Sequence, residues 1–118
     1  MWKRLTDSDL ISTYRAGFFD PPPEAIVELL DALSGEPFAE RVWAVTTHNN
    51  LRLTTAPNYK DEIRHGAIWL LSVQEGISVS YFRPGSLVAS KSLKCSETDA
   101  LEVVRRFVND FLLDRENE

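Results

Sequence analysis

The sequence predicts a single α+β domain: two N-terminal helices, an antiparallel sheet of four to five strands, and a C-terminal amphipathic helix. Apolar residues recur at helical spacing only near the two ends of the chain, in residues 7–33 and 96–113. The middle contains short runs of β-branched and aromatic residues separated by turn residues, which is typical of strands. Because these turns are short, neighbouring strands are expected to pair antiparallel. A chain of 118 residues is expected to form one domain, 1–118.

The first two helices have recognisable beginnings and ends. Thr6 is a helix N-cap residue by type, and the helix predicted after it covers residues 7–16. Gly17 is expected to end it. The second helix is predicted over residues 24–33, where apolar residues form one stripe, and Gly35 ends it.

The strand region has five candidate strands and one long connection. Residues 56–65 are polar and irregular, and they are predicted to form the longest loop of this region. The candidate strands are residues 41–47, 51–55, 67–73, 77–82 and 87–93. Ser96 is expected to cap the final helix, with Asp99 three residues later. Its apolar stripe is Leu101, Val104, Phe107, Val108, Phe111 and Leu112.

Charge is distributed unevenly along the chain. Residues 1–40 carry three basic and eight acidic side chains, residues 41–95 carry seven and three, and residues 96–118 carry three and seven. The fold is therefore expected to place a basic sheet against acidic helices, which suggests a binding surface without identifying its ligand. The overall charge of −5 argues against nucleic-acid binding by the molecule as a whole.

The cysteine content indicates a cellular setting. Cys95 is the only cysteine, so an intramolecular disulfide and a cysteine-based zinc site are both excluded, and a reducing cytoplasm fits best. No apolar run approaches the roughly 18–20 residues that a membrane span needs, and no secretory signal is expected.

One hairpin allows a prediction of register. A three-residue turn at residues 74–76 would place uniformly apolar pairs on the core face. A two-residue turn, taken to pair Ser72 with Val79, would mix polar and apolar residues on each face, so the three-residue turn is preferred. The preferred pairs are Val73 with Ile77, Leu71 with Val79, and Trp69 with Tyr81.

This register predicts an apolar cluster on the outer face of the sheet. Ile68, Leu70 and Phe82 would gather there, with Arg83 at the rim. Either the first helix or the 56–65 loop covers this cluster, or it is exposed and a partner docks on it.

Motifs that would identify an enzyme are absent: the sequence contains no nucleotide-binding glycine loop, zinc-binding helix or nucleophile elbow. His48 and His65 fall in predicted turns, where a surface histidine is the simplest interpretation. A metal pair with Asp61 or Glu62 has no helical spacing to support it. The only thiol chemistry open to the chain is a pair of Cys95 with His65, and the start of the last helix would lower the pKa of the thiol if the sulfur faced it, but a structural cysteine is the simpler interpretation.

Two adjacent acids are the remaining candidates for catalysis. Asp61 and Glu62 offer general acid–base chemistry, and with His65 they would centre an enzyme on the 56–65 loop. Because Lys60 and Arg64 flank them, a salt-bridged surface loop is the simpler interpretation. No catalytic residue, metal or cofactor is predicted.

Basic residues of the strand region suggest an alternative binding surface. Arg52, Arg64 and Lys91 could meet an anion or nucleic acid, beside Phe82 and Tyr59 for base stacking. Alternatively, lysine on a strand discourages pairing between sheet edges, and basic strand ends pair with acidic helices.

The last third of the chain resembles a known family. The stretches Ile77-Ser-Val-Ser-Tyr-Phe-Arg-Pro-Gly and Ser96-Glu-Thr-Asp-Ala-Leu-Glu-Val-Val-Arg-Arg-Phe-Val are similar to small bacterial immunity proteins of toxin systems. The resemblance implies a small cytoplasmic inhibitor that binds another protein. The resemblance carries over no functional residue. The hairpin register gives the predicted partner-binding residues, which are Ile68, Leu70, Phe82 and Arg83, and the alternative is an anion-binding face with Arg52, Arg64 and Lys91.

Overall fold

The computed structural model describes residues 2–16, 24–47, 50–74 and 76–116. The helix end predicted at Gly17 and the turn residue His48 lie outside these ranges. The α+β class and the antiparallel sheet are confirmed. The elements in chain order are β1 (Lys3–Arg4), α1 (Leu10–Ala16), α2 (Glu24–Leu33), the 3-10 helix η1 (Ala39–Arg41), β2 (Trp43–Thr47), β3 (Asn50–Thr54), α3 (Tyr59–His65), β4 (Ala67–Val73), β5 (Gly76–Phe82), β6 (Lys91–Cys95) and α4 (Ala100–Glu116).

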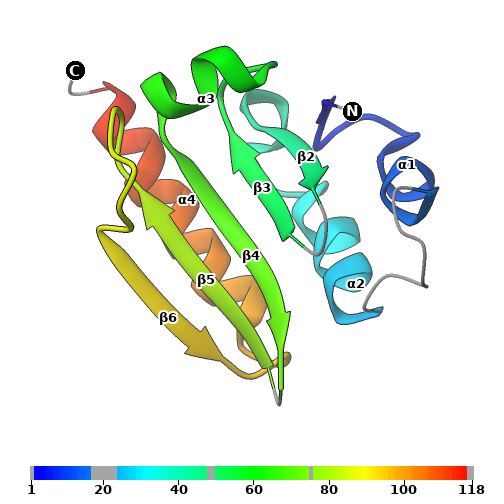
Figure 1. The fold of residues 1–118 in the computed structure, drawn as a ribbon. Coiled ribbons are helices and arrows are strands. Elements are labelled where there is room, and N and C mark those ends of the chain that lie inside the picture. The colour runs from blue at the N-terminus through cyan, green and yellow to red at the C-terminus, as the bar shows by residue number, and fades with distance from the viewer. Residues whose placement is uncertain (1, 17–23, 48–49, 75, 117–118) are drawn as a thin grey trace.

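The sheet has six strands that follow one another in chain order, and every neighbouring pair is antiparallel (Figure 1). The count exceeds the expected four to five because Lys3 and Arg4 add the short strand β1 to the free side of β2. The two edges of the sheet are therefore β1 and β6.

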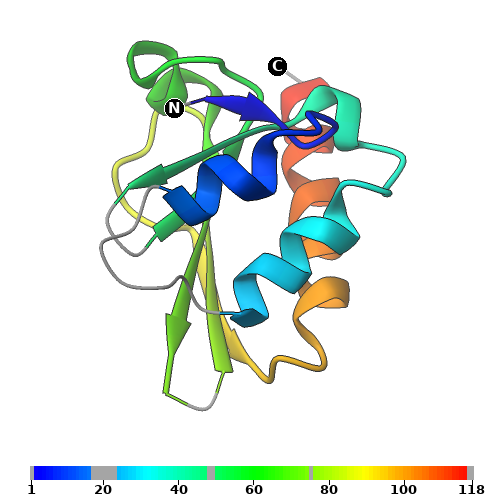
Figure 2. The same ribbon diagram turned by 90° about the vertical axis from the view of Figure 1, so that its right-hand side faces the viewer.

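Helices α2 and α4 lie side by side behind the sheet, and α1 lies next to α2 (Figures 1 and 2). The core between the two layers is continuous, and the predicted stripes of α2 and α4 point into it. From the sheet it receives Leu51 and Leu53 of β3 and Val79 of β5. The opposite face, called the outer face below, has α3 over one end, and no other described helix crosses it.

The β4–β5 register differs by one residue from the predicted one. Val73 pairs with Gly76, so Leu70 pairs with Val79 and Ile68 with Tyr81. A shift of one residue transfers every side chain of a strand to the other face. Ile68 and Leu70 are consequently fully buried in the core, and the prediction that they lie on the outer face is wrong.

The error has a physical cause in β4 itself. Both of its faces are apolar, with Ile68 and Leu70 on one side and Trp69 and Leu71 on the other, so the strand does not specify its own register. Its neighbours do: the apolar side of β3 and the apolar side of β5 both face the core.

Three further segments depart from expectation. Helix α1 begins at Leu10, not at residue 7 directly after Thr6. Residues 59–65 form the helix α3 rather than part of a loop, because the Asn58 side chain caps it by accepting a hydrogen bond from the Asp61 N–H at 2.9 Å. The last strand is Lys91–Cys95 instead of 87–93, which leaves Leu87 and Val88 in a connection at the surface. Within the described residues, no helix is both long enough and apolar enough to cross a membrane.

A candidate binding pocket on the outer face

A pocket of about 340 Å³ lies where α3, the paired ends of β4 and β5, and the connection between β5 and β6 meet. This volume is at the lower end of the roughly 300–1,000 Å³ that is usual for ligand sites. We call it the outer pocket. Its lining residues are Arg52, Glu62, Ile63, Gly66, Ala67, Trp69, Phe82, Ser86 and Leu87.

Two aromatic rings form one wall of the outer pocket. Trp69 of β4 and Phe82 of β5 are diagonal neighbours on the outer face, and their ring centroids lie 4.8 Å apart with planes tilted by 40°. Arg52 of β3 pairs with Trp69 across the strands, and its guanidinium carbon lies 5.0 Å from the centroid of the indole ring. Such a cation–π contact fixes the orientation of both side chains.

A buried ion pair lies beside this wall. The Arg52 Nη1 atom is 3.2 Å from Glu62 Oε1, and the two side chains are only 12% and 8% exposed. The other carboxylate oxygen, Glu62 Oε2, is buried and accepts no hydrogen bond from the residues that the structure describes. Burial raises the pKa of Glu62, and the Arg52 charge opposes that rise. A buried acceptor without a donor destabilises a fold by about 1–3 kcal/mol.

The position of Glu62 follows from the two ends of α3. Asn58 caps the first turn, and Gly66 ends the last one with a φ of +86° while donating its N–H to the Glu62 carbonyl at 2.8 Å. The Gly66 carbonyl in turn accepts a hydrogen bond from the buried Thr54 hydroxyl at 2.7 Å. A side chain at Gly66 would place its Cβ 2.7 Å from the Phe82 carbonyl oxygen, so the close approach of α3 to β5 requires glycine.

The β5–β6 connection is attached to the same helix. The Gly85 N–H donates to the Ile63 carbonyl at 2.6 Å, and Ser86 makes hydrogen bonds to the backbone of Val88 in both directions. These contacts hold the rim of the outer pocket in a defined position relative to its aromatic wall.

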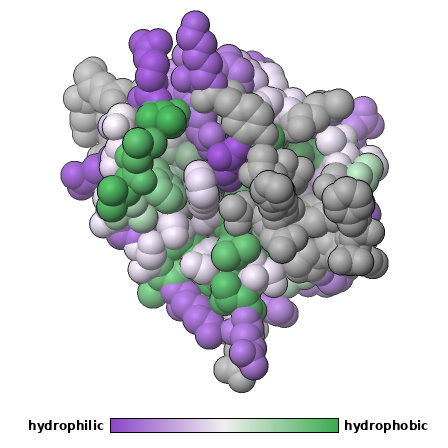
Figure 3. All heavy atoms as spheres, in the orientation of Figure 1, coloured by the Kyte–Doolittle hydropathy of each residue, from purple (hydrophilic) through white to green (hydrophobic). Residues whose placement is uncertain are grey.

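The rim is apolar although it faces solvent. Ile63 is 48% exposed, Leu87 77% and Val88 74%. Figure 3 views the outer face and shows hydrophobic residues gathered at the upper left, over the β5–β6 connection. We use the name outer patch for Ile63, Leu87 and Val88 together with the outer pocket.

The predicted partner-binding residues divide between this site and the core. Phe82 forms the wall of the outer pocket, and the exposed Arg83 follows it in the chain. Ile68 and Leu70 face the helices instead. The sequence reasoning missed Trp69, which the wrong register assigned to the core, and Leu87, which it assigned to a strand.

The predicted anion-binding residues do not share a surface. Arg52 lies on the outer face beside Glu62, whereas Lys91 lies on the helix-covered side, 2.6 Å from Asp110 of α4 and over the Phe107 ring. Arg64 is exposed on α3 and lies 3.6 Å from Asp61. Each of the three cations has a carboxylate partner.

Asp61, Glu62 and His65 all lie on α3, but the two residues considered for thiol chemistry are apart. His65 precedes β4, which pairs with the end of β5, whereas Cys95 pairs with Ile77 at the start of β5. His65 shares a hydrogen bond with the Thr55 hydroxyl at 2.9 Å. Burial and the Asp99 charge raise the pKa of the Cys95 thiol, contrary to the lowering expected from the helix start. Among described residues, no cluster of histidine, cysteine and acidic side chains could hold a metal ion.

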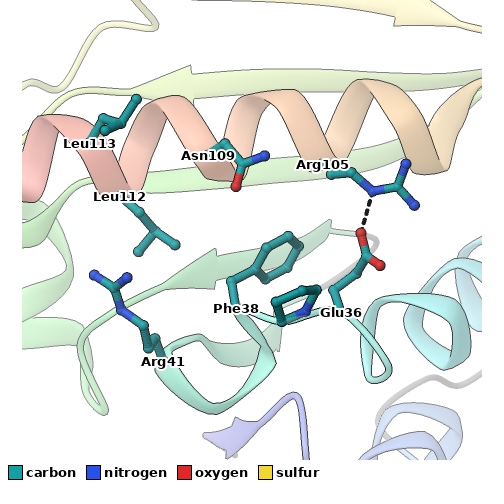
Figure 4. Close-up of a pocket in the computed structure, with 8 residues that line it drawn as sticks. Glu36, Phe38, Arg41, Arg105, Asn109, Leu112 and Leu113 are labelled. Atoms are coloured by element: carbon teal, nitrogen blue, oxygen red, sulfur yellow. Dashed lines mark hydrogen bonds and ion pairs between the residues drawn. The ribbon is translucent and has the colours of Figure 1, made fainter.

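A larger and more open pocket of about 600 Å³ lies between the η1 region and α4 (Figure 4). We call it the helix pocket. An ion pair between Glu36 and Arg105 closes one end, and Phe38 and Leu112 contribute apolar surface.

No family model, curated protein or solved structure matches this chain.

Proposed function

We propose that the protein is a binding module that docks on another protein through the outer patch. The observation that carries the proposal is the combination of strongly exposed apolar side chains, Leu87 above all, with an aromatic pocket directly beside them. Contiguous exposed apolar surface marks interaction sites in proteins. The energetic centre of such interfaces is usually a small pocket surrounded by apolar contacts that exclude water.

The surroundings of the outer patch suit a protein partner. The patch combines side chains from α3, two strands and a connection that hydrogen bonds attach to α3, so the surface is ordered before binding. Preorganisation reduces the entropy lost on association. Arg83 is exposed next to Phe82 and offers a charged contact at the rim, where charges mainly affect the rate of association.

The more specific proposal is an inhibitor of the immunity or antitoxin type that acts in the cytoplasm. It is favoured by the resemblance of residues 77–108 to small bacterial immunity proteins. The excess of acidic residues in the two end segments adds a surface charge that would attract a basic partner.

The test is a differential capture from lysate of the native host. Three proteins are compared: the wild type, Leu87→Asp in the outer patch, and Leu113→Asp, which places the same charge on an exposed leucine of α4 at the helix pocket. The proposal predicts that a partner retained by the wild type and by Leu113→Asp is lost by Leu87→Asp. Retention of the same partner by all three proteins would contradict it, provided that thermal melting shows all three folded.

A further inference from the structure

The chemistry of the outer pocket indicates what kind of group it receives. Its Glu62 Oε2 atom is buried and has no donor within the described residues. An occupant that brings a hydrogen-bond donor to this carboxylate removes the cost of leaving it unsatisfied. Because solvent does not reach this oxygen in the empty pocket, a donor reaches it only when side chains of the lining move slightly.

The charge of the outer pocket favours a neutral donor. Arg52 and Glu62 lie 3.2 Å apart and balance each other. A second cation would be repelled by Arg52, and an anion would be repelled by the carboxylate that the occupant has to approach. A hydroxyl or an aromatic N–H donates a hydrogen bond without adding charge.

The walls of the outer pocket favour an aromatic ring. Trp69 and Phe82 present tilted rings, and Ile63 and Leu87 add apolar contact at the mouth. Aromatic rings pack well against one another in offset or tilted arrangements at centroid distances of roughly 4.5–7 Å. The volume of about 340 Å³ leaves room for one side chain of this kind.

Tyrosine and tryptophan combine a large apolar aromatic ring with a neutral donor, and both are enriched at the energetic centres of interfaces. We propose that the outer pocket receives a tyrosine or tryptophan side chain of the partner protein, whose hydroxyl or indole N–H donates to the Glu62 carboxylate. This inference rests on the proposed function and adds the chemistry of the anchoring residue.

The inference is tested without the partner, by titrating the protein with three amino-acid amides. N-acetyl-tyrosinamide and N-acetyl-phenylalaninamide differ by one hydroxyl, and N-acetyl-tryptophanamide supplies the indole donor. NMR spectra follow the Trp69 indole and the backbone signals of Gly66 and Ser86. Tyrosinamide and tryptophanamide should bind about tenfold more tightly than phenylalaninamide, the effect of one hydrogen bond to a charged group. Equal affinities, or no binding at these residues, would overturn the inference.

Two variants separate the donor contact from the aromatic contact. The double variant Arg52→Leu/Glu62→Leu removes the acceptor without leaving a buried charge, so the preference for tyrosinamide over phenylalaninamide should disappear. Leu87→Ala shortens a side chain of the pocket lining that is 77% exposed and contributes little to the stability of the fold. It should therefore lower the affinity for all three amides equally and keep the preference for tyrosinamide over phenylalaninamide. A preference that survives the double variant, or affinities that Leu87→Ala leaves unchanged, would contradict the assignment. Leu113→Ala is the control and should change nothing.

Failure of this inference can be distinguished from failure of the docking proposal. Equal binding of the amides overturns the tyrosine or tryptophan anchor, even where Leu87→Asp still loses the captured partner. Retention of the partner by Leu87→Asp overturns docking at the outer patch, even where the amides show the expected preference.

Discussion

The outer pocket and the helix pocket each contain an arginine–glutamate pair, and the two pairs differ in their access to water. In the helix pocket the Arg105 side chain is 44% exposed, and its hydrogen bond to Glu36 raises the pKa of the guanidinium (Figure 4). In the outer pocket the Arg52–Glu62 pair is almost fully buried and one carboxylate oxygen has no donor in the described part of the chain.

This difference shows that size alone does not identify a binding site. The helix pocket is the larger, yet water reaches the Arg105 end of its ion pair, and a pair that is open to water on one side contributes less to stability than its geometry suggests, even though the Glu36 side chain is only 16% exposed. A buried ion pair loses solvation on folding, and packed apolar residues in its place are often as stable or more stable. A contribution to stability therefore explains the presence of the Arg52–Glu62 pair poorly. The proposed binding of a donor at its unsatisfied oxygen explains it better.

The largest expected effect on stability comes from removing Glu62, and the matched change in the other pair is Glu36→Leu. Glu62→Leu leaves Arg52 charged and buried, so the free energy of unfolding should fall by about 3–5 kcal/mol, measured by urea denaturation. The double variant Arg52→Leu/Glu62→Leu should recover most of this loss, and Glu36→Leu should cost far less than Glu62→Leu. Similar losses for Glu62→Leu and Glu36→Leu would remove the distinction between the two pockets.

The next effect concerns the two glycines that frame the outer pocket. Gly66 and Gly85 both have positive φ, but a Cβ at Gly66 meets the Phe82 carbonyl at 2.7 Å, whereas a Cβ at Gly85 meets nothing within 4 Å. Gly85→Ala should cost about 1 kcal/mol of backbone strain, and Gly66→Ala about 2–4 kcal/mol because overpacking is added. Equal losses in denaturation would show that α3 does not depend on its close contact with β5.

A smaller effect is the pH dependence of stability. Because burial raises the pKa of Glu62 in the folded protein, the folded state holds this proton more tightly than the unfolded state. The stabilisation from this group is complete below the ordinary pKa of glutamate and decreases as pH rises through the raised folded pKa. Melting temperatures of the wild type and Glu62→Gln, measured from pH 4 to pH 8, should therefore diverge progressively, with the wild type losing more. Parallel curves would contradict the buried environment of Glu62.

The smallest effect is chemical and lies at the other end of the sheet. The raised pKa of Cys95 lowers the fraction of thiolate, so its reaction with an aromatic disulfide reagent at pH 7.5 should be slower than that of free cysteine. The rate should increase when urea unfolds the protein. A folded-state rate above that of free cysteine would restore Cys95 as a candidate nucleophile.

Much of the fold could be predicted from local patterns. The α2 and α4 stripes and the alternation of β5 each bury one side of an element, so the sequence alone shows which side faces the core. The register of β4 could not be predicted in this way, because its two sides are equally apolar and only its neighbours in the sheet distinguish them.

The outer pocket was hidden by that same ambiguity. Trp69 was expected in the core, and Glu62 was expected in a solvated loop. The short helix that buries Glu62 had visible signals, since Asn58 is a good N-cap residue and Gly66 a good helix end. The seven residues between them are mostly polar and form no apolar stripe, so the sequence pattern does not predict this helix. The helix forms where it can pack against the sheet.

The most direct test of the central claim is a single NMR titration of the wild-type protein with N-acetyl-tyrosinamide. The account predicts that the largest shifts fall on Gly66, Trp69 and Ser86 around the outer pocket, with Asn109 and Leu113 of the helix pocket unchanged. Shifts centred on Asn109 and Leu113, or no saturable shift at either place, would contradict the claim that the smaller pocket is the binding site.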